Sequence, residues 1–221
     1  NHNMINNRIM AIGAHPDDIE FGCGGTLLKH KLNGDFIVYV CMTNTESVDG
    51  TNNTIIRTAE ENKSEAILAA SKLKCDKVEF LPFKDLNVPF SFESVSKLES
   101  LIKKHNINTI YTHWAGDANQ DHISTFRTTM AAARYIPNVY CYEQIPIPRM
   151  SENQMDINYY VDISDTFNTK ITASLCHQSQ IKKYKHQGFD IKENLKTLAK
   201  FRGIQARCMY AEAFKIIKQV W

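Results

Sequence analysis

The sequence has no long hydrophobic run, no run of basic residues and no closely paired cysteines. Its apolar stretches are far shorter than the roughly 20 residues of a membrane-spanning helix, and its start lacks the hydrophobic region of a signal peptide. The six cysteines include no Cys-x-x-Cys pair, which argues against a zinc-thiolate or redox motif. The formal net charge is only +2, so the composition gives no support for a nucleic-acid partner. We therefore expect a soluble, cytoplasmic protein with reduced thiols.

The length and composition fit one domain with a full hydrophobic core. The chain has 221 residues, of which 43% are hydrophobic and 23% charged. Residues 1–3, before Met4, look like an expression scar and are set aside. The sequence shows no internal repeat, low-complexity tract or linker, so a single domain over residues 1–221 is expected. It does not fix the oligomeric state, and a homo-oligomer is compatible with it.

Strand-like and helix-like segments alternate along most of the chain. The unbroken apolar run 36–42 is typical of a strand covered on both faces, as in a parallel sheet. The other expected strands are 8–13, 78–81, 109–112, 139–142 and 158–163. A first helix is expected after the charged segment, to about residue 32, and further helices are expected over 55–73, 92–105, 123–135, 165–184 and 190–204. This alternation predicts βαβ units and an α/β fold with a parallel sheet.

A crowded group of charged residues stands where segment 8–13 turns into the first helix. His15, Asp17, Asp18 and Glu20 fall within six residues. Carboxylates so close together repel one another unless a positive charge lies between them, and a metal ion would supply it. The glycines that follow match neither a phosphate-binding loop nor a dinucleotide fingerprint, because the third glycine position of the fingerprint holds Leu27.

A second group of the same kind follows strand 109–112. It begins at His113 and ends in Asp121-His122. Because the carboxyl ends of parallel strands lie at one edge of a sheet, the two groups should meet. Imidazole and carboxylate ligands without a thiolate suit Zn²⁺ or another borderline divalent ion.

The spacing suggests different roles for neighbouring residues. His15 and Asp18 are three apart, so one helical turn could bring both to one ion, and His122 is the natural third ligand. Asp17 would then stay free beside the metal, where a hydrolytic general base is needed. The alternative is that Asp17, Asp18 and Asp121 merely cap helices, but two such groups together favour the metal.

These stretches resemble the PIG-L/LmbE-like family of zinc-dependent N-deacetylases. The segment AHPDDIE with the following GCGGTL is similar to the family's first signature, and residues 113–122 are similar to its DxHxDH or DxNxDH signature. Weaker similarity covers residues 161–180, with VDI, a lysine and HQSQ, and residues 202–214, with RG and YAEAF. The resemblance thus spans nearly the whole chain.

The resemblance implies a fold, a site and a substrate class. The fold would be a Rossmann-like three-layer α/β sandwich with a mostly parallel central sheet. The zinc ligands would be His15, Asp18 and His122, and Asp17 would be the catalytic base. The substrate would be a small molecule, an N-acetylated amino sugar of the GlcNAc type or its conjugate, from which acetate is released to leave a free amine.

Two positions depart from the family's pattern. Many members have a histidine where this chain has Asn119, oriented by a carboxylate such as Asp121, to stabilise the oxyanion. Asn119 can donate only a neutral hydrogen bond, so we expect it to share this role with His113. Many members also have a substrate-binding arginine at the position of Asn62, whereas Arg57 lies a turn or more earlier.

Several further residues are candidates for substrate contact. Glu143 follows strand 139–142 at the same sheet edge, Arg149 could bind a phosphate or carboxylate, and Trp114 could stack on a sugar ring. The full set of substrate-binding candidates is Asn62, Arg57, Glu143, Arg149 and Trp114.

Other classes of function stay open at this point. A nucleotide- or cofactor-binding α/β protein such as a methyltransferase would need a phosphate cradle in the first loop, where acidic residues stand. A non-catalytic zinc- or sugar-binding relative is suggested by Asn119. A zinc amidase acting on a non-acetyl amide of a sugar conjugate would use the same residues as a deacetylase. N-deacetylation is the interpretation that we favour.

Overall fold

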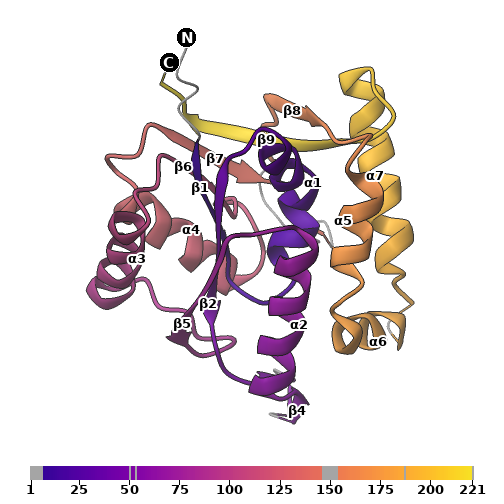
Figure 1. Ribbon diagram of the computed structural model, residues 1–221. Helices are drawn as coiled ribbons and strands as arrows, with labels where there is room; N and C mark the ends of the chain where they lie inside the picture. The colour runs from indigo at the N-terminus through magenta and orange to yellow at the C-terminus, as the bar shows by residue number, and fades with distance from the viewer. Residues whose placement is uncertain (1–6, 50, 53, 146–153, 187, 221) are drawn as a thin grey trace.

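A seven-stranded sheet lies between two layers of helices (Figure 1). The computed structural model describes residues 7–49, 51–52, 54–145, 154–186 and 188–220. The strand order is β5-β2-β1-β6-β7-β9-β8. Neighbours from β5 to β7 pair parallel, and β9 pairs antiparallel with both β7 and β8. The predicted α/β fold with a mostly parallel central sheet is confirmed.

The elements follow one another in the expected alternation. The sheet strands are β1 (Arg8–Gly13), β2 (Phe36–Thr43), β5 (Lys77–Phe83), β6 (Thr109–Thr112), β7 (Asn138–Tyr142), β8 (Tyr159–Asp162) and β9 (Ala211–Lys218). The helices are α1 (Asp18–Leu32), α2 (Ala59–Lys72), α3 (Phe92–Lys104), α4 (Gln120–Ala132), α5 (Phe167–Ser174), α6 (Gln178–His186) and α7 (Ile191–Ala206). A separate hairpin pairs β3 (Ser47–Val48) with β4 (Ile55–Arg57).

The two faces of the sheet are covered by different helices (Figure 1). Helices α3 and α4 lie on one face and α1 and α2 on the other, where α5 packs against α1 and α2. Strand β2 is buried along almost its whole length because helices cover it on both sides, which explains its unbroken apolar sequence.

Two predicted helices differ from the observed ones for local reasons. Residues 55–57 form strand β4, not the start of a helix, and α2 begins only after Thr58. The Thr58 hydroxyl and the Glu61 carboxylate make a reciprocal capping box there, which fixes the helix start. The predicted helix 165–184 is two helices, α5 and α6, separated by residues 175–177.

The sheet brings the two charged groups together. Strands β1 and β6 are parallel neighbours, with Ile9 opposite Thr109 and Ala11 opposite Tyr111. Their carboxyl ends therefore open at the same edge, and residues 14–18 face the segment 113–122 across it. Two segments that are far apart in the sequence therefore contribute to one site.

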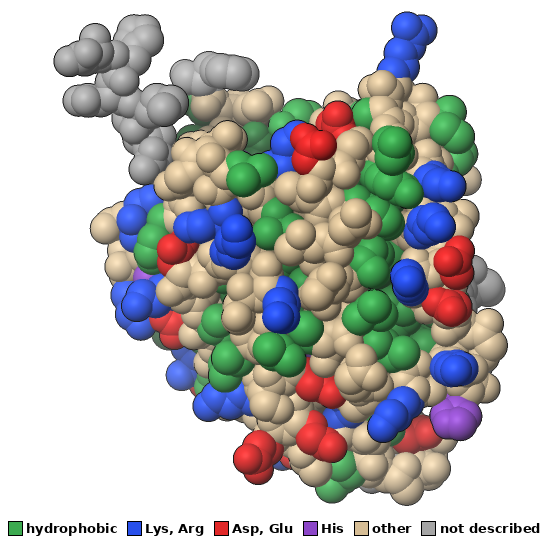
Figure 2. Space-filling model, turned by 45° about the vertical axis from the view of Figure 1, so that its right-hand side comes forward, with side chains coloured by type: hydrophobic (Ala, Val, Ile, Leu, Met, Phe, Trp, Pro, Cys, Tyr) green, Lys and Arg blue, Asp and Glu red, His purple; other side chains and the backbone are tan. Residues whose placement is uncertain are grey.

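The surface carries mixed charge. On the face shown in Figure 2, lysine and arginine side chains are interspersed with aspartate and glutamate, and hydrophobic side chains lie between them. Within the ranges described above, none of the helices has the length and hydrophobicity needed to cross a membrane.

The close approach of α1 to β7 gives a stability prediction. A Cβ added at Gly22 would lie 2.2 Å from Cδ2 of Tyr142, whereas one added at Gly24 would lie 3.4 Å from the nearest atom, Cδ2 of Leu73. We expect Gly22→Ala to lower the free energy of unfolding by about 1–3 kcal/mol through overpacking. The control Gly24→Ala should be neutral or stabilising by up to about 1 kcal/mol. Urea unfolding measures both, and equal effects would contradict the described packing.

Candidate functional site

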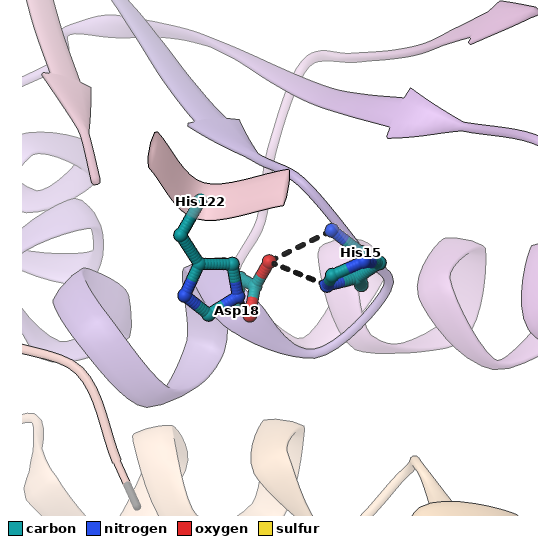
Figure 3. A group of neighbouring side chains, drawn as sticks. All are labelled: His15, Asp18 and His122. Carbon is teal, nitrogen blue, oxygen red and sulfur yellow. Dashed lines mark hydrogen bonds and ion pairs between the residues drawn. The ribbon is translucent and has the colours of Figure 1, made fainter. Parts of the chain in front are cut away.

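Three side chains from the two charged groups converge at the sheet edge. His15 precedes α1, Asp18 begins it, and His122 lies in the first turn of α4. Each offers a ligand atom within 4.8 Å of the other two. The Asp18 carboxylate stands between the rings, with Oδ2 3.7 Å from His15 Nδ1 and Oδ1 3.4 Å from His122 Nε2. Figure 3 shows the arrangement, in which Asp18 Oδ2 also accepts from the backbone N–H of His15.

A carboxylate holds the far side of each imidazole. Asp117 Oδ2 lies 2.7 Å from His122 Nδ1, and Asp121 Oδ2 lies 2.8 Å from His15 Nε2. Asp85 adds a second carboxylate 3.1 Å from the same His15 nitrogen. Such partners fix the tautomer of a metal-binding histidine, because the N–H points at the carboxylate and the other nitrogen is left to bind the metal.

The donor set fits a zinc ion. A tetrahedral zinc with ligands at about 2.0–2.1 Å would place neighbouring ligand atoms about 3.3 Å apart. His122 Nε2 lies 3.4 Å from Asp18 Oδ1, close to this value, and His15 Nδ1 lies 3.7 Å from the other oxygen, Oδ2. Two imidazoles and one carboxylate leave a fourth position open, which is the arrangement of catalytic zinc sites. Burial lowers the pKa of His122, but the Asp18 and Asp117 carboxylates outweigh it and raise that pKa to about 9.

Asp17 stands beside this group, and within the described part of the chain its Oδ2 has no hydrogen-bond partner. It occupies the N-cap position of α1 but makes no side-chain capping bond, and its φ of 117° is in the left-handed region. A non-glycine residue held there is strained, which is typical of functional positions. Burial and the neighbouring Asp18 carboxylate raise the pKa of Asp17 to about 6. The capping alternative from the sequence therefore does not account for Asp17.

Further buried polar groups lie near Asp17. Glu20 is fully buried and accepts from Tyr39 Oη at 3.4 Å. His177, also fully buried, has Nε2 3.4 Å from Glu20 Oε1. Among the described residues neither His177 nitrogen has a hydrogen-bond partner, and the same holds for Asp17 Oδ2.

His113 occupies a different place from the one expected. Its ring is fully buried and stacks on His122 at 3.9 Å between centroids, with Nε2 accepting from the Ala14 N–H and lying 3.0 Å from Asp18 Oδ2. Burial lowers the pKa of His113 to about 4, so the ring is neutral. His113 lies behind the ligands, outside the cavity lining, and the expectation that it shares the oxyanion role is not supported.

Asn119 faces the cavity and caps α4. Its Oδ1 accepts from the Asp121 N–H at 2.9 Å. The oxygen is thus used by the cap, and the amide NH₂ stays available as a donor. The carboxylate of Asp121 bonds the Val88 N–H and His15, so it orients a ligand and not the residue at position 119.

A cavity of about 350 Å³ opens in front of the ligands, within the size range of small-molecule sites. Its lining includes His15, Asp17, Asp18, Arg57, Asp85, Asp117, Asn119, His122, Gln144, Gln180, Lys183 and Tyr184. Arg57 is 2% exposed, and within the described part of the chain its Nε and Nη1 have no hydrogen-bond partner. Asn62 does not reach the cavity, because its NH₂ donates to Thr45 O and Ser47 Oγ and so ties the hairpin loop to α2.

Three other expected substrate contacts lie elsewhere. Glu143 pairs with the guanidinium of Arg202 at 2.5 and 2.8 Å, away from the metal cluster, and Gln144 faces the site instead, donating to Asp18 Oδ1 at 2.6 Å. Of these two consecutive residues, Gln144 and not Glu143 lines the cavity, so Glu143 as a substrate contact stays a prediction from the sequence. Trp114 lies outside the cavity lining and packs over Gly116. Arg149 falls outside the described residues.

Two carboxylates near the ligands were missed from the sequence. Asp117 belongs to the second signature, and its place five residues before His122 could have identified it. Asp85 comes from the loop after β5 and is held by the Val48 N–H at 3.2 Å, a contact with no local sequence signal.

Solved structures share this fold. The N,N'-diacetylchitobiose deacetylase from Pyrococcus horikoshii, in complex with an inhibitor, aligns with a TM-score of 0.78 and 22% identity over 96% of this chain and 84% of that one. The 4-carboxy-2-hydroxymuconate hydratase GalB from Pseudomonas putida aligns with a TM-score of 0.82 and 20% identity over 97% and 98%. The fold therefore also occurs in a protein named for a different reaction.

Sequence comparisons point to deacetylases. The uncharacterized deacetylase YaiS of Escherichia coli is 36% identical over 141 residues, which cover 61% of this chain and 72% of YaiS. The diacetylchitobiose deacetylase of Thermococcus kodakarensis is 24% identical over 97% of this chain and 84% of its own length. The family model PIG-L, described as GlcNAc-PI de-N-acetylase, matches residues 10–133, a segment that contains the candidate ligands His15, Asp18 and His122 and the carboxylates that contact their rings. This protein belongs to the PIG-L family.

Proposed function

We propose that this protein is a zinc-dependent N-deacetylase that removes the acetyl group from an N-acetylated amino sugar or its conjugate. The products would be acetate and a free amine. The observation that carries the proposal is the pairing of a zinc-like donor set with the Asp17 carboxylate at the same cavity, whose Oδ2 has no hydrogen-bond partner among the described residues. The deacetylases among the relatives support the choice of an N-acetyl amide as substrate.

Different side chains at the cavity have different roles in the proposed amide hydrolysis. When bound by His15, Asp18 and His122, a zinc ion supplies Lewis acidity toward an attacking water and the acetyl carbonyl. Asp17 takes a proton from the water as the new C–O bond forms, and returns it to the nitrogen as the C–N bond breaks. Its raised pKa of about 6 suits a group that must both accept and donate a proton near neutral pH.

Asn119 is the proposed donor to the oxygen that becomes negative. Its side-chain oxygen is committed to the α4 cap, so the NH₂ group is oriented as a donor at the cavity wall. One preorganised donor of this kind contributes about 2.7–4 kcal/mol to transition-state stabilisation. A neutral amide can therefore replace the histidine found at this position in many members.

Arg57 is the proposed contact for the polar groups of the sugar. Its Nε and Nη1 groups are buried without partners in the part of the chain that the structure describes, which is costly unless a ligand accepts from them. Glu65 lies 3.7 Å from Nη1 and offsets the charge, so neutral sugar oxygens are suitable acceptors. Arg57 would thus serve where the sequence has Asn62 in place of the usual arginine.

The function is tested by acetate release with an Asp17 variant. Purified protein with zinc is incubated with a panel of N-acetyl amino sugars and their phosphate, nucleotide and glycoside conjugates, and acetate and new amine are measured. We expect Asp17→Asn to lower turnover by at least about 100-fold, because the general base is lost, while the zinc content stays near that of the parent protein.

The panel also separates the other functions. N-propionyl analogues that turn over faster than N-acetyl ones would indicate an amidase with a different acyl group. Zinc binding without product formation on any substrate would indicate a non-catalytic relative. An Asp17→Asn variant as active as the parent would refute the assignment of the base.

The partners of the ligand histidines give a prediction for zinc affinity. We expect Asp117→Asn to weaken zinc binding by about 10–100-fold, because the amide no longer fixes the His122 tautomer. Competition with a chromogenic chelator measures the dissociation constant. The control is Asp156→Asn, which removes an exposed carboxylate 3.3 Å from Lys215 and should leave the affinity unchanged. Equal affinities for all three proteins would contradict the proposed orientation of His122.

The two uses of Asn119 can be separated by substitution. Asn119→Ser keeps a good capping oxygen for α4 but removes the NH₂ donor. We expect a loss of kcat of about 100-fold with little loss of thermal stability, because only the oxyanion contact is removed. Asn119→Ala should lower both kcat and thermal stability, because it removes the NH₂ donor and the capping oxygen. If Asn119→Ser retains full turnover, the residue is a cap only.

A further inference from the structure

Helix α1 is interrupted one turn after the site. Cys23 has φ −142° and ψ 15°, which is not helical, so α1 consists of a first turn, Asp18–Gly22, and a longer segment that follows Cys23. The first turn carries Asp18 and follows Asp17. A break of this kind leaves carbonyls before it and N–H groups after it without helical partners.

A buried ion pair from the end of the chain satisfies the groups on both sides of the break. Lys170 Nζ, from α5, donates to Phe21 O at 2.8 Å, ahead of the break. Glu212, from β9, accepts from the Gly25 N–H at 2.9 Å and the Thr26 N–H at 2.7 Å, after the break. The two side chains join each other, with Lys170 Nζ 2.5 Å from Glu212 Oε1.

The pair is buried and separate from the cavity. Lys170 is 3% exposed and Glu212 is 4% exposed, and neither lines the cavity that contains the ligands. A buried ion pair adds little net stability compared with apolar residues of the same size. Its hydrogen bonds to three backbone groups across the break therefore call for an explanation other than stability alone.

We propose that Lys170 and Glu212 are positioning residues that hold the first turn of α1 in the orientation the site needs. The pair fixes the angle between the two segments of α1 by bonding Phe21 O on one and two N–H groups on the other. The Phe21 side chain lines the cavity, so the same contact also sets its wall. Gly22 closes against Tyr142, whose hydroxyl donates to Ile12 O at 2.8 Å, and so the turn is held from the β1 side as well.

The test compares a variant that cuts the link with one that only weakens the cluster. Lys170→Met removes the bond to Phe21 O. The matched control, Thr26→Val, removes the Thr26 hydroxyl bond to Glu212 at 2.5 Å but leaves every backbone contact across the break. Hydrogen exchange of the amides of residues 18–22 is measured by mass spectrometry on metal-free protein, with strand β1 as the internal reference.

We expect the ratio of exchange in the first turn to exchange in β1 to rise at least about 10-fold in Lys170→Met and to stay within about twofold in Thr26→Val. Zinc affinity should fall about 10-fold in Lys170→Met because Asp18 is misplaced. Turnover should fall by about 10–100-fold with KM nearly unchanged, since small displacements of reacting groups act on kcat. The turnover and zinc measurements rest on the proposed zinc-dependent deacetylase function, whereas the exchange measurement on metal-free protein does not.

A purely structural role predicts a different pattern. In that case both variants lose stability, exchange rises equally in the first turn and in β1, and zinc affinity and kcat of the folded fraction stay at parental values. That result would overturn the proposal. If Lys170→Met does not fold, Glu212→Gln is measured by the same exchange ratio, because one amide oxygen cannot accept from both N–H groups and Lys170 as the carboxylate does.

Discussion

Repulsion among buried carboxylates is the constraint on which the site depends. Asp18, Asp85, Asp117 and Asp121 all lie within 3.4 Å of one of two imidazole rings, and Asp17 stands beside them. Two like charges 4 Å apart repel by about 4 kcal/mol at the effective dielectric constant of a protein surface. The rings separate these carboxylates, and a divalent ion between His15, Asp18 and His122 would complete the compensation. The same ion that this site would bind would thus also offset the repulsion among its carboxylates.

The sheet and the break in α1 together place these charged groups around one point. Parallel pairing of β1 and β6 brings the two charged segments to one edge. The interruption at Cys23 then lets the first turn of α1 point at that edge at its own angle, while the rest of the helix packs along the sheet. The buried Lys170–Glu212 pair lies at this interruption, and through it α5 and β9 contact the first turn of α1.

Hydrophobic patterning was sufficient to predict the alternating elements, and parallel pairing was sufficient to predict that His15, Asp18 and His122 meet. The sequence could not predict which way individual side chains point at the strand ends and in the loops. The alternation after β7 sends Glu143 to Arg202 and Gln144 to the site, and no pattern distinguishes the two before the strand end is known. Asp85 reaches His15 only through the conformation of a loop, and His113 looks like a catalytic residue until its burial behind His122 is seen.

The position of Glu212 on the last strand has a consequence for how the protein is made. During synthesis the segment that bears Asp17 and Asp18 leaves the ribosome before the carboxylate that bonds Gly25 and Thr26, which follows almost two hundred residues later. A nascent chain can therefore form β1 and β2 while its catalytic turn is still unanchored. On the inferred role of this pair, the site becomes rigid only when strand β9 enters the sheet, so the proposed hydrolysis would require that pairing first.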